Sequence, residues 1–212
     1  MTKMKVAVIG AGTMGIGIAQ VAANAGNDVL LYDTRGDAVD RSLADLRITL
    51  QKIVEKGKMG QAEADLLLSR IKPVVDVQQL NGCAIAIEAI VEDLQIKKKL
   101  FIELESICED NSGPCVFATN TSSLSVTAIA AACKRPERVI GLHFFNPAPL
   151  LPLVEVVPGL ATTPGLVDQM MELMKSWGKI PVQCKDTPGF IVNRVARHFY
   201  VESLKVVEEQ VA

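Results

Sequence analysis

Residues 6–15 read Val-Ala-Val-Ile-Gly-Ala-Gly-Thr-Met-Gly, an apolar run followed at once by three glycines in the spacing GxGxxG. The apolar run predicts a buried strand at residues 5–9, and the glycines predict a tight turn that leads into a helix. In such a turn Gly10 allows the chain to reverse, Gly12 lets the backbone approach a pyrophosphate, and Gly15 lets the helix pack closely on the strand. The N-terminal amides of that helix would face the phosphates. The stretch therefore predicts a dinucleotide site.

An acidic residue strengthens this prediction. Asp33 follows the second predicted strand, residues 29–32, at the distance from the glycines where a carboxylate binds the ribose hydroxyls of the adenosine half. Thr13 and Met14 belong to the same predicted cofactor loop. Asp33 favours NAD over NADP, although Arg35 leaves open a 2′-phosphate as the ligand. The competing interpretation is a glycine-rich turn beside a solvated aspartate, and the combined strand, helix and acid spacing makes it the weaker one.

The rest of the chain repeats the alternation of strand and helix. Apolar runs of strand length are separated by segments of helical period, which predicts an α/β fold with a Rossmann-type, mostly parallel sheet. The predicted strands are residues 5–9, 29–32, 84–88, 115–119, 139–143, 153–157 and 180–184, of which 153–157 lies among prolines and is expected to be an edge or antiparallel strand. Two helices, residues 37–56 and 61–70, exceed what a crossover needs and are expected to project from the sheet.

The composition excludes several classes of protein. Of 212 residues 49% are hydrophobic and 22% charged, so the chain can bury a large core and is not disordered. A formal net charge of −2 gives no basic footprint for nucleic acid or for an anionic membrane. Glycines interrupt the apolar N-terminus before a signal peptide could form, which favours a cytoplasmic location. Five cysteines without CxxC or His-Cys metal spacing are expected to be reduced thiols, and no metal is expected.

A turn at Thr187-Pro188-Gly189 predicts a domain boundary, with a cofactor domain at residues 1–186 and the first helix of a truncated helical domain at 187–212. That helix, residues 190–210, carries an apolar stripe with nothing after it to cover the stripe. We expect the stripe to fold back on the cofactor domain or to pack against a second copy of the chain.

Two further motifs follow predicted strands and could carry chemistry. His143 ends one strand and Glu155 lies 12 residues on, in the next, so a reversal could pair them as a proton-transfer group. From spacing alone, a core histidine beside an unrelated glutamate is equally consistent. Asn120-Thr-Ser122-Ser also follows a buried strand and could hold a substrate oxygen, or could be only the turn before a helix that Ser125 caps.

Five stretches together resemble one family. Residues 10–15, Asn-Thr-Ser-Ser-Leu at 120–124, Gly-Leu-His-Phe-Phe-Asn-Pro at 141–147, Leu-Val-Glu-Val-Val at 153–157 and Asp-Thr-Pro-Gly-Phe-Ile-Val-Asn-Arg at 186–194 are similar to those of the L-3-hydroxyacyl-CoA dehydrogenases. The sequence around Asn193 is most similar to that of bacterial 3-hydroxybutyryl-CoA or 3-hydroxyadipyl-CoA dehydrogenases. The resemblance implies NAD-dependent oxidation of an L-3-hydroxyacyl-CoA in fatty-acid β-oxidation or phenylacetate catabolism, and a homo-oligomer in the full-length form. We expect the 212-residue chain to be weakly active.

The resemblance also implies roles for individual residues. His143 and Glu155 would be the catalytic pair, and Ser122 and Asn193 would hold the reacting oxygen. NAD would be contacted by the glycine loop, by Asn120, and by the side chains of Asp33, Glu92, Lys97, Ser122 and Asn146. Lys52 and Lys56, on the projecting helical pair, would contact coenzyme A. Taken alone, Glu92 and Lys97 are typical of a solvated, capped helix end. Two rivals remain: another NAD-linked β-hydroxyacid dehydrogenase, or a non-catalytic relative that only binds NAD.

Overall fold

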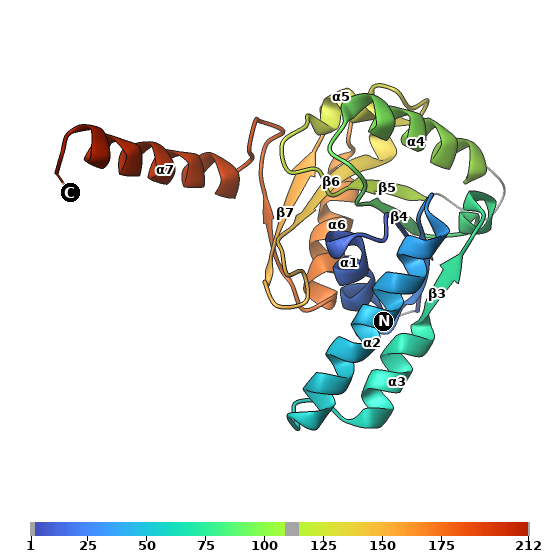
Figure 1. Cartoon of the computed structure of the whole chain (residues 1–212). Coiled ribbons are helices and arrows are strands. Elements are labelled where there is room, and N and C mark those ends of the chain that lie inside the picture. The colour runs from blue at the N-terminus through green and yellow to red at the C-terminus, as the bar shows by residue number, and fades with distance from the viewer. Residues whose placement is uncertain (1–2, 109–114, 212) are drawn as a thin grey trace.

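The computed structural model describes residues 3–108 and 115–211 (Figure 1). Within them, eight strands form one sheet in the order β3-β2-β1-β4-β5-β6-β7-β8. Neighbouring strands are parallel except for β6 and β7, which run antiparallel. The strands are β1 (Lys5–Ile9), β2 (Asp28–Tyr32), β3 (Ile71–Val74), β4 (Ile85–Glu88), β5 (Val116–Thr119), β6 (Val139–Phe144), β7 (Leu153–Pro158) and β8 (Ile180–Gln183). The predicted α/β class with a mostly parallel sheet is confirmed.

Helices cover both faces of the sheet. They are α1 (Thr13–Asn24), α2 (Gly36–Glu55), α3 (Gln61–Arg70), α4 (Leu94–Ile107), α5 (Val126–Ala130), α6 (Pro164–Ser176) and α7 (Val192–Glu208), with short 3₁₀ turns at Val77–Leu80 and Pro136–Arg138. One apolar core joins the sheet to α1, α2, α3 and α6, and a second joins the opposite face to α4 and α5. The central strands are buried on both faces, which explains their unbroken apolar sequences. None of the helices in the described residues combines the length and apolar character needed to cross a bilayer.

The order of the strands places the site. Because β1 lies between β2 and β4, the chain leaves β1 toward one edge of the sheet and later returns to the other side. Ligands of open α/β sheets bind at such a switch point, outside the carboxyl ends of the strands. The glycine loop after β1 and His143 near the end of β6 therefore lie at the same edge. The expected projection of α2 and α3 is also present, since both helices extend beyond the sheet (Figure 1).

One strand differs from the sequence-based expectation. Residues 153–157 were expected at an edge or in an antiparallel pair, and the antiparallel alternative is confirmed: β7 runs antiparallel to β6 and pairs with β8 on its other side. Strand β3, in contrast, was not predicted at all. Its four residues include Lys72 and Pro73, and it pairs only with β2, at the outer edge of the sheet. A proline is tolerated there because one side of an edge strand needs no hydrogen-bond donor.

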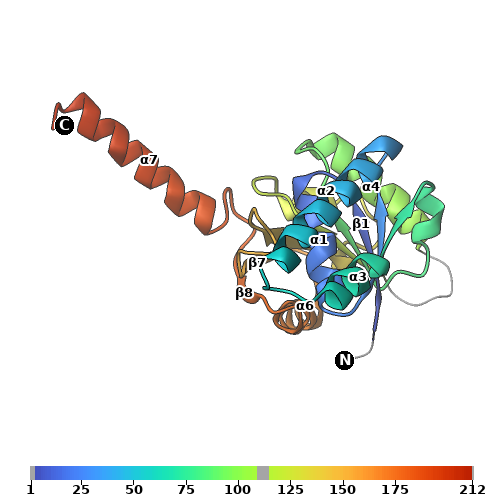
Figure 2. The ribbon, with the colours of Figure 1, turned by 60° about the horizontal axis from the view of Figure 1, so that its bottom comes forward.

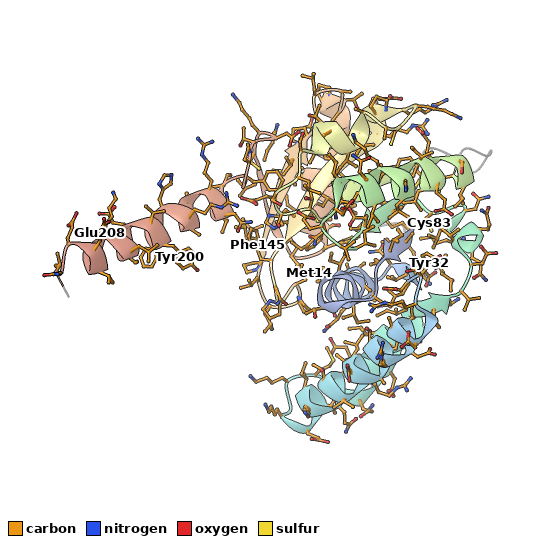
Figure 3. The ribbon with its side chains drawn as sticks, turned by 45° about the horizontal axis from the view of Figure 1, so that its top comes forward. Met14, Tyr32, Cys83, Phe145, Tyr200 and Glu208 are labelled. Carbon is orange, nitrogen blue, oxygen red and sulfur yellow. The ribbon has the colours of Figure 1, made fainter. Side chains whose placement is uncertain are left out.

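Helix α7 projects away from the sheet (Figures 1 and 2), and Tyr200 and Glu208 lie far from the rest of the chain (Figure 3). As the structure describes it, no residue of this helix is buried, and its apolar side chains, such as Phe199 and Leu204, are about 70% exposed. The expectation that the stripe folds back on the cofactor domain is therefore wrong for the single chain. Gly189 and Phe190, in the turn before this helix, both adopt positive φ. Packing against a second copy stays a prediction.

Candidate active site

The glycine loop is built so that only glycine fits at two of its positions. Gly10 has a φ of +103°, and a Cβ atom there would lie 2.5 Å from the carbonyl oxygen of Ala89. A Cβ on Gly15 would lie 1.7 Å from the carbonyl oxygen of Gly10. These close approaches hold the start of α1 directly against the ends of β1 and β4, which is the packing that the motif predicts.

The N-terminus of α1 is open to a ligand. Gly12 is the N-cap, no side chain caps the helix, and its first turn contains no acidic residue. A Cβ atom on Gly12 would meet nothing within 4 Å. The first amides of a helix attract anions and have no partner within the helix, so this terminus fits a pyrophosphate.

Asp33 joins the loop after β2 to the glycine loop. Its Oδ2 accepts a hydrogen bond from the backbone N–H of Ala11 at 2.8 Å, and its Oδ1 accepts a hydrogen bond from the backbone N–H of Arg35 at 2.9 Å. Each carboxylate oxygen has a second lone pair, so the group can still accept hydrogen bonds from ribose hydroxyls. The Arg35 side chain is 69% exposed, and its Nε lies 3.7 Å from Asp33 Oδ1. The Asp33 carboxylate, rather than the Arg35 guanidinium, is thus the group held against the glycine loop.

His143 and Glu155 form a buried pair across β6 and β7. The two residues are directly opposite in the antiparallel register, and His143 Nδ1 lies 2.6 Å from Glu155 Oε2. A carboxylate only accepts hydrogen bonds, so Nδ1 carries the proton and Nε2 is the nitrogen left to exchange one. The rings of Phe145 and Phe190 pack on the imidazole, with centroids 4.5 Å and 5.6 Å away. Of the two interpretations left open by the spacing, the structure thus contains the paired one.

The second oxygen of Glu155 reaches the start of α7. Oε1 accepts hydrogen bonds from the backbone N–H groups of Ile191 and Val192, both at 2.9 Å. These amides lie at the N-terminus of a helix, whose dipole stabilises a carboxylate. One side chain therefore holds both the imidazole and the helix that carries Asn193. Asn193 Nδ2 in turn donates to the carbonyl oxygen of Ser122 at 3.3 Å, which brings these two predicted site residues together.

Glu92 organises the turn after β5. Its Oε1 accepts hydrogen bonds from Thr121 Oγ1 at 2.5 Å and from the backbone N–H groups of Ser122 and Ser123 at 2.9 Å and 3.1 Å. Lys97 Nζ lies 3.2 Å from Glu92 Oε2. Burial opposes ionisation of this carboxyl, but the Thr121 hydrogen bond and the Lys97 charge outweigh burial and lower the pKa of Glu92 to about 2.

We expect this depressed pKa to make the stability of the fold depend on acid pH. The unfolded chain binds a proton at Glu92 near pH 4.3, whereas the folded chain does so near pH 2, so the stabilisation is complete above about pH 4.3 and is lost as the pH falls toward 2. Because the side chain is partly exposed, the contribution is about 1 kcal/mol rather than the full shift. Urea unfolding between pH 5 and pH 2.5 should show a shallower decline for Glu92→Gln than for the unchanged chain. Parallel curves for the two proteins would contradict the assignment.

The remaining predicted residues are placed less directly. Asn120 Oδ1 accepts a hydrogen bond from the backbone N–H of Phe144 at 2.8 Å, so this side chain pins the end of β6. Asn146 lines a cleft of about 720 Å³ between the glycine loop, α2 and the loop at residues 147–150. Helix α2 contributes Thr49 and Ile53 to that cleft, whereas Lys52 and Lys56, at the end of the same helix, are not among the residues that line it.

The comparisons with known proteins agree with this geometry. Residues 5–187 match the family model described as 3-hydroxyacyl-CoA dehydrogenase, NAD binding domain. The chain belongs to this family. It is 52% identical over 207 residues to a 3-hydroxyadipyl-CoA dehydrogenase of Escherichia coli (strain K12), covering 98% of the chain and 43% of that protein. It is 44% identical to a 3-hydroxybutyryl-CoA dehydrogenase of Clostridioides difficile, covering 99% and 73%.

A solved structure is similar over the whole chain. The crystal structure of a 3-hydroxybutyryl-CoA dehydrogenase from Escherichia coli K12 has a TM-score of 0.95 and 50% sequence identity, and covers 100% of this chain and 44% of the other. The chain thus spans less than half the length of that protein. As a member of the NAD-binding family, this chain takes NAD as its cofactor. Three features of the site fit that molecule: the open N-terminus of α1, the free space beside Gly12, and the Asp33 carboxylate.

For this family member we expect Asp33→Ala to weaken NADH binding roughly 10- to 100-fold, because a hydrogen bond to a charged group contributes about 1.5 to 3 kcal/mol. The measurement is a fluorescence titration of the 212-residue chain with NADH. Asp28→Ala is the matched control, because Asp28 begins the same strand and its ion pair with Lys3 lies on the surface. Equal affinities for the two variants would remove Asp33 from the cofactor site.

Sequence reasoning missed two acidic residues of this family member's site. Glu88, the last residue of β4, is fully buried and contacts Lys97 and Thr119. Asp186 accepts hydrogen bonds from Ser125 Oγ and from the N–H groups of α5, and although burial opposes ionisation, hydrogen bonds from Thr127 and Ser125 leave the pKa of Asp186 lowered. The N-cap role expected for Ser125 is confirmed. A buried-strand glutamate was the only available signal for Glu88. Asp186 was marked only as the first residue of the motif at 186–194, and that motif assigned it no role.

Proposed function

We propose that this protein carries out the reversible, NAD-dependent oxidation of an L-3-hydroxyacyl-CoA to the 3-oxoacyl-CoA. The observation that carries the proposal is the buried His143–Glu155 pair, 2.6 Å apart, at the same sheet edge as the open N-terminus of α1. A proton-transfer group and a dinucleotide site at one edge are the two parts that a hydroxyl-oxidising dehydrogenase requires.

In the proposed reaction NAD, when bound, supplies the acceptor for the hydride that leaves C3. His143 accepts the hydroxyl proton at Nε2 and returns it in the reverse direction. Glu155 stabilises the resulting imidazolium through the Nδ1 contact and keeps the ring oriented. Ser122 and Asn193, which the structure brings together, are proposed to hold the reacting oxygen. A displacement of about 1 Å in such groups can cost about 100-fold in rate, so the anchoring of α7 by Glu155 matters for turnover.

The coenzyme A arm is proposed to run along α2. The 720 Å³ cleft beside the glycine loop is large enough for an extended arm, and its walls at Thr49 and Ile53 lead toward Lys52 and Lys56 near the end of that helix. Ammonium groups at that end suit phosphate groups on the nucleotide part of coenzyme A. We therefore keep Lys52 and Lys56 as proposed coenzyme A contacts outside the cleft.

The deciding assay is NADH oxidation with acetoacetyl-CoA, followed at 340 nm as absorbance loss by roughly micromolar protein. Oxidation with acetoacetyl-CoA but not with free acetoacetate supports the proposal. Oxidation with both would favour a general β-hydroxyacid dehydrogenase, and NADH binding without turnover would favour a non-catalytic relative. Participation in fatty-acid β-oxidation or phenylacetate catabolism is proposed from the names of the relatives. A cytoplasmic location and a homo-oligomer stay predictions.

A further inference from the structure

A buried charge cluster lies between the cofactor loop and the His143 pair. It consists of Glu88, at the end of β4, and of Lys97 and Glu92, from α4 and the segment before it. Glu88 Oε1 accepts hydrogen bonds from Lys97 Nζ at 2.5 Å and from the N–H of Ile90 at 2.8 Å, and Oε2 accepts one from Thr119 at 2.7 Å. Every polar atom of the Glu88 carboxylate is therefore engaged.

Two of the three members of the cluster are removed from water. The exposure of Glu88 is 0% and that of Lys97 is 1%, whereas the Glu92 side chain is 35% exposed. Lys97 lies between the two carboxylates, so its ammonium is paired within the cluster and is not exposed at the surface. Two carboxylates and one ammonium leave one net negative charge in a region of low dielectric, where a charge acts over a longer range than in water.

The order of strands puts this charge on the path of the cofactor. Asp33 lies beyond β2, the glycine loop follows β1, and His143 lies in β6. In the sheet, β4 and β5 lie between β1 and β6. A dinucleotide held at Asp33 whose other end reacts beside His143 must therefore cross the carboxyl ends of β4 and β5, where Glu88 and the Glu92-bound turn lie.

The two redox forms of the cofactor differ in charge at that end. The oxidised nicotinamide ring is a cation and the reduced ring is neutral, so a fixed negative charge nearby stabilises the oxidised form selectively. We infer that Glu88 is a positioning residue that holds Lys97 against Glu92, and that the net negative charge of this cluster raises the affinity for NAD⁺ relative to NADH. The inference rests on the family's cofactor and on the place of His143 in the proposed function, but not on which hydroxyl substrate is oxidised.

The test compares the dissociation constants of NAD⁺ and NADH by calorimetry, using the 212-residue chain without acyl-CoA. In Glu88→Gln the ratio of the NAD⁺ constant to the NADH constant should rise on the order of 10-fold, because the cluster becomes neutral. Glu105→Gln is the matched control: Glu105 is a buried glutamate on α4, 4% exposed, but it accepts hydrogen bonds from the N–H groups of Lys134 and Arg135 at the opposite end of the sheet. Its ratio should not change.

A second variant separates charge from structure. Glu88→Gln combined with Lys97→Met restores one net negative charge while removing the ion pair, so its ratio should return close to that of the unchanged chain. If Glu88→Gln alone does not fold, the double variant still tests the inference, because a shifted ratio in the double variant would contradict it. An unchanged ratio in Glu88→Gln, with both forms weakened equally, would overturn the inference, as would a double variant whose ratio stays shifted. Failure of the acetoacetyl-CoA assay would leave these binding ratios untouched, so the two proposals fail separately.

Discussion

Replacing His143 by glutamine lowers turnover of acetoacetyl-CoA about 100-fold or more while NADH affinity stays within about twofold, if His143 is the proton-transfer residue. Glutamine can keep a hydrogen bond to Glu155 Oε2 and the contacts with Phe145 and Phe190, but it cannot accept and release a proton near neutral pH. The measurement pairs steady-state NADH oxidation with an NADH titration of the same protein.

Two controls make this result specific. His198→Gln changes the other histidine of the chain, which lies on the projecting helix α7, and should leave turnover unchanged. Thermal unfolding of His143→Gln should lie close to that of the unchanged chain. Turnover of His143→Gln near the original rate would show that another group moves the proton, and the proposed mechanism would then be wrong.

The second large effect is expected in the glycine loop. Gly12→Ala should weaken NADH binding on the order of 100-fold without lowering the stability of the free protein. The new methyl group meets no protein atom within 4 Å, and the φ of −71° at this position suits alanine. The methyl group instead occupies the space through which a pyrophosphate approaches the helix amides, and losing two hydrogen bonds to a charged group accounts for about 3 kcal/mol.

Neighbouring and distant glycines provide the contrast. Gly15→Ala should lower both stability and NADH affinity, because its Cβ would collide with the carbonyl oxygen of Gly10, and overpacking of this kind costs about 1 to 3 kcal/mol or more. Gly165→Ala, on α6 and also in open space, should change neither quantity appreciably. Calorimetric unfolding and NADH titration of the three variants distinguish these cases. Normal NADH affinity in Gly12→Ala would mean that the cofactor phosphates do not approach this loop.

Most of the sheet could be predicted from the sequence because each central strand is a short, continuous apolar run. Strand β1 was predicted with its observed bounds, and most others within one residue at either end. Strand β3 escaped because an edge strand buries little and tolerates Pro73, so it has no apolar run to detect. The prolines around residues 153–157 left an edge strand and an antiparallel pair equally open, and only the pairing of β7 with both β6 and β8 decided for the antiparallel pair.

In the candidate site, too, local patterns could be predicted from the sequence and contacts between distant segments could not. The sequence alone determined the cofactor loop, Asp33 and the candidate pair His143 and Glu155, because strand ends and glycine spacing are local patterns that the backbone turns into positions at one sheet edge. The tertiary structure alone decided which groups meet: the close contact between His143 and Glu155, the hydrogen bond from Ser125 to Asp186 across 61 residues of chain, and the Glu88–Lys97 pair. Such contacts form between segments distant in sequence. Burying their charged groups costs free energy that only mutual attraction and hydrogen bonding offset, and no local periodicity records this pairing.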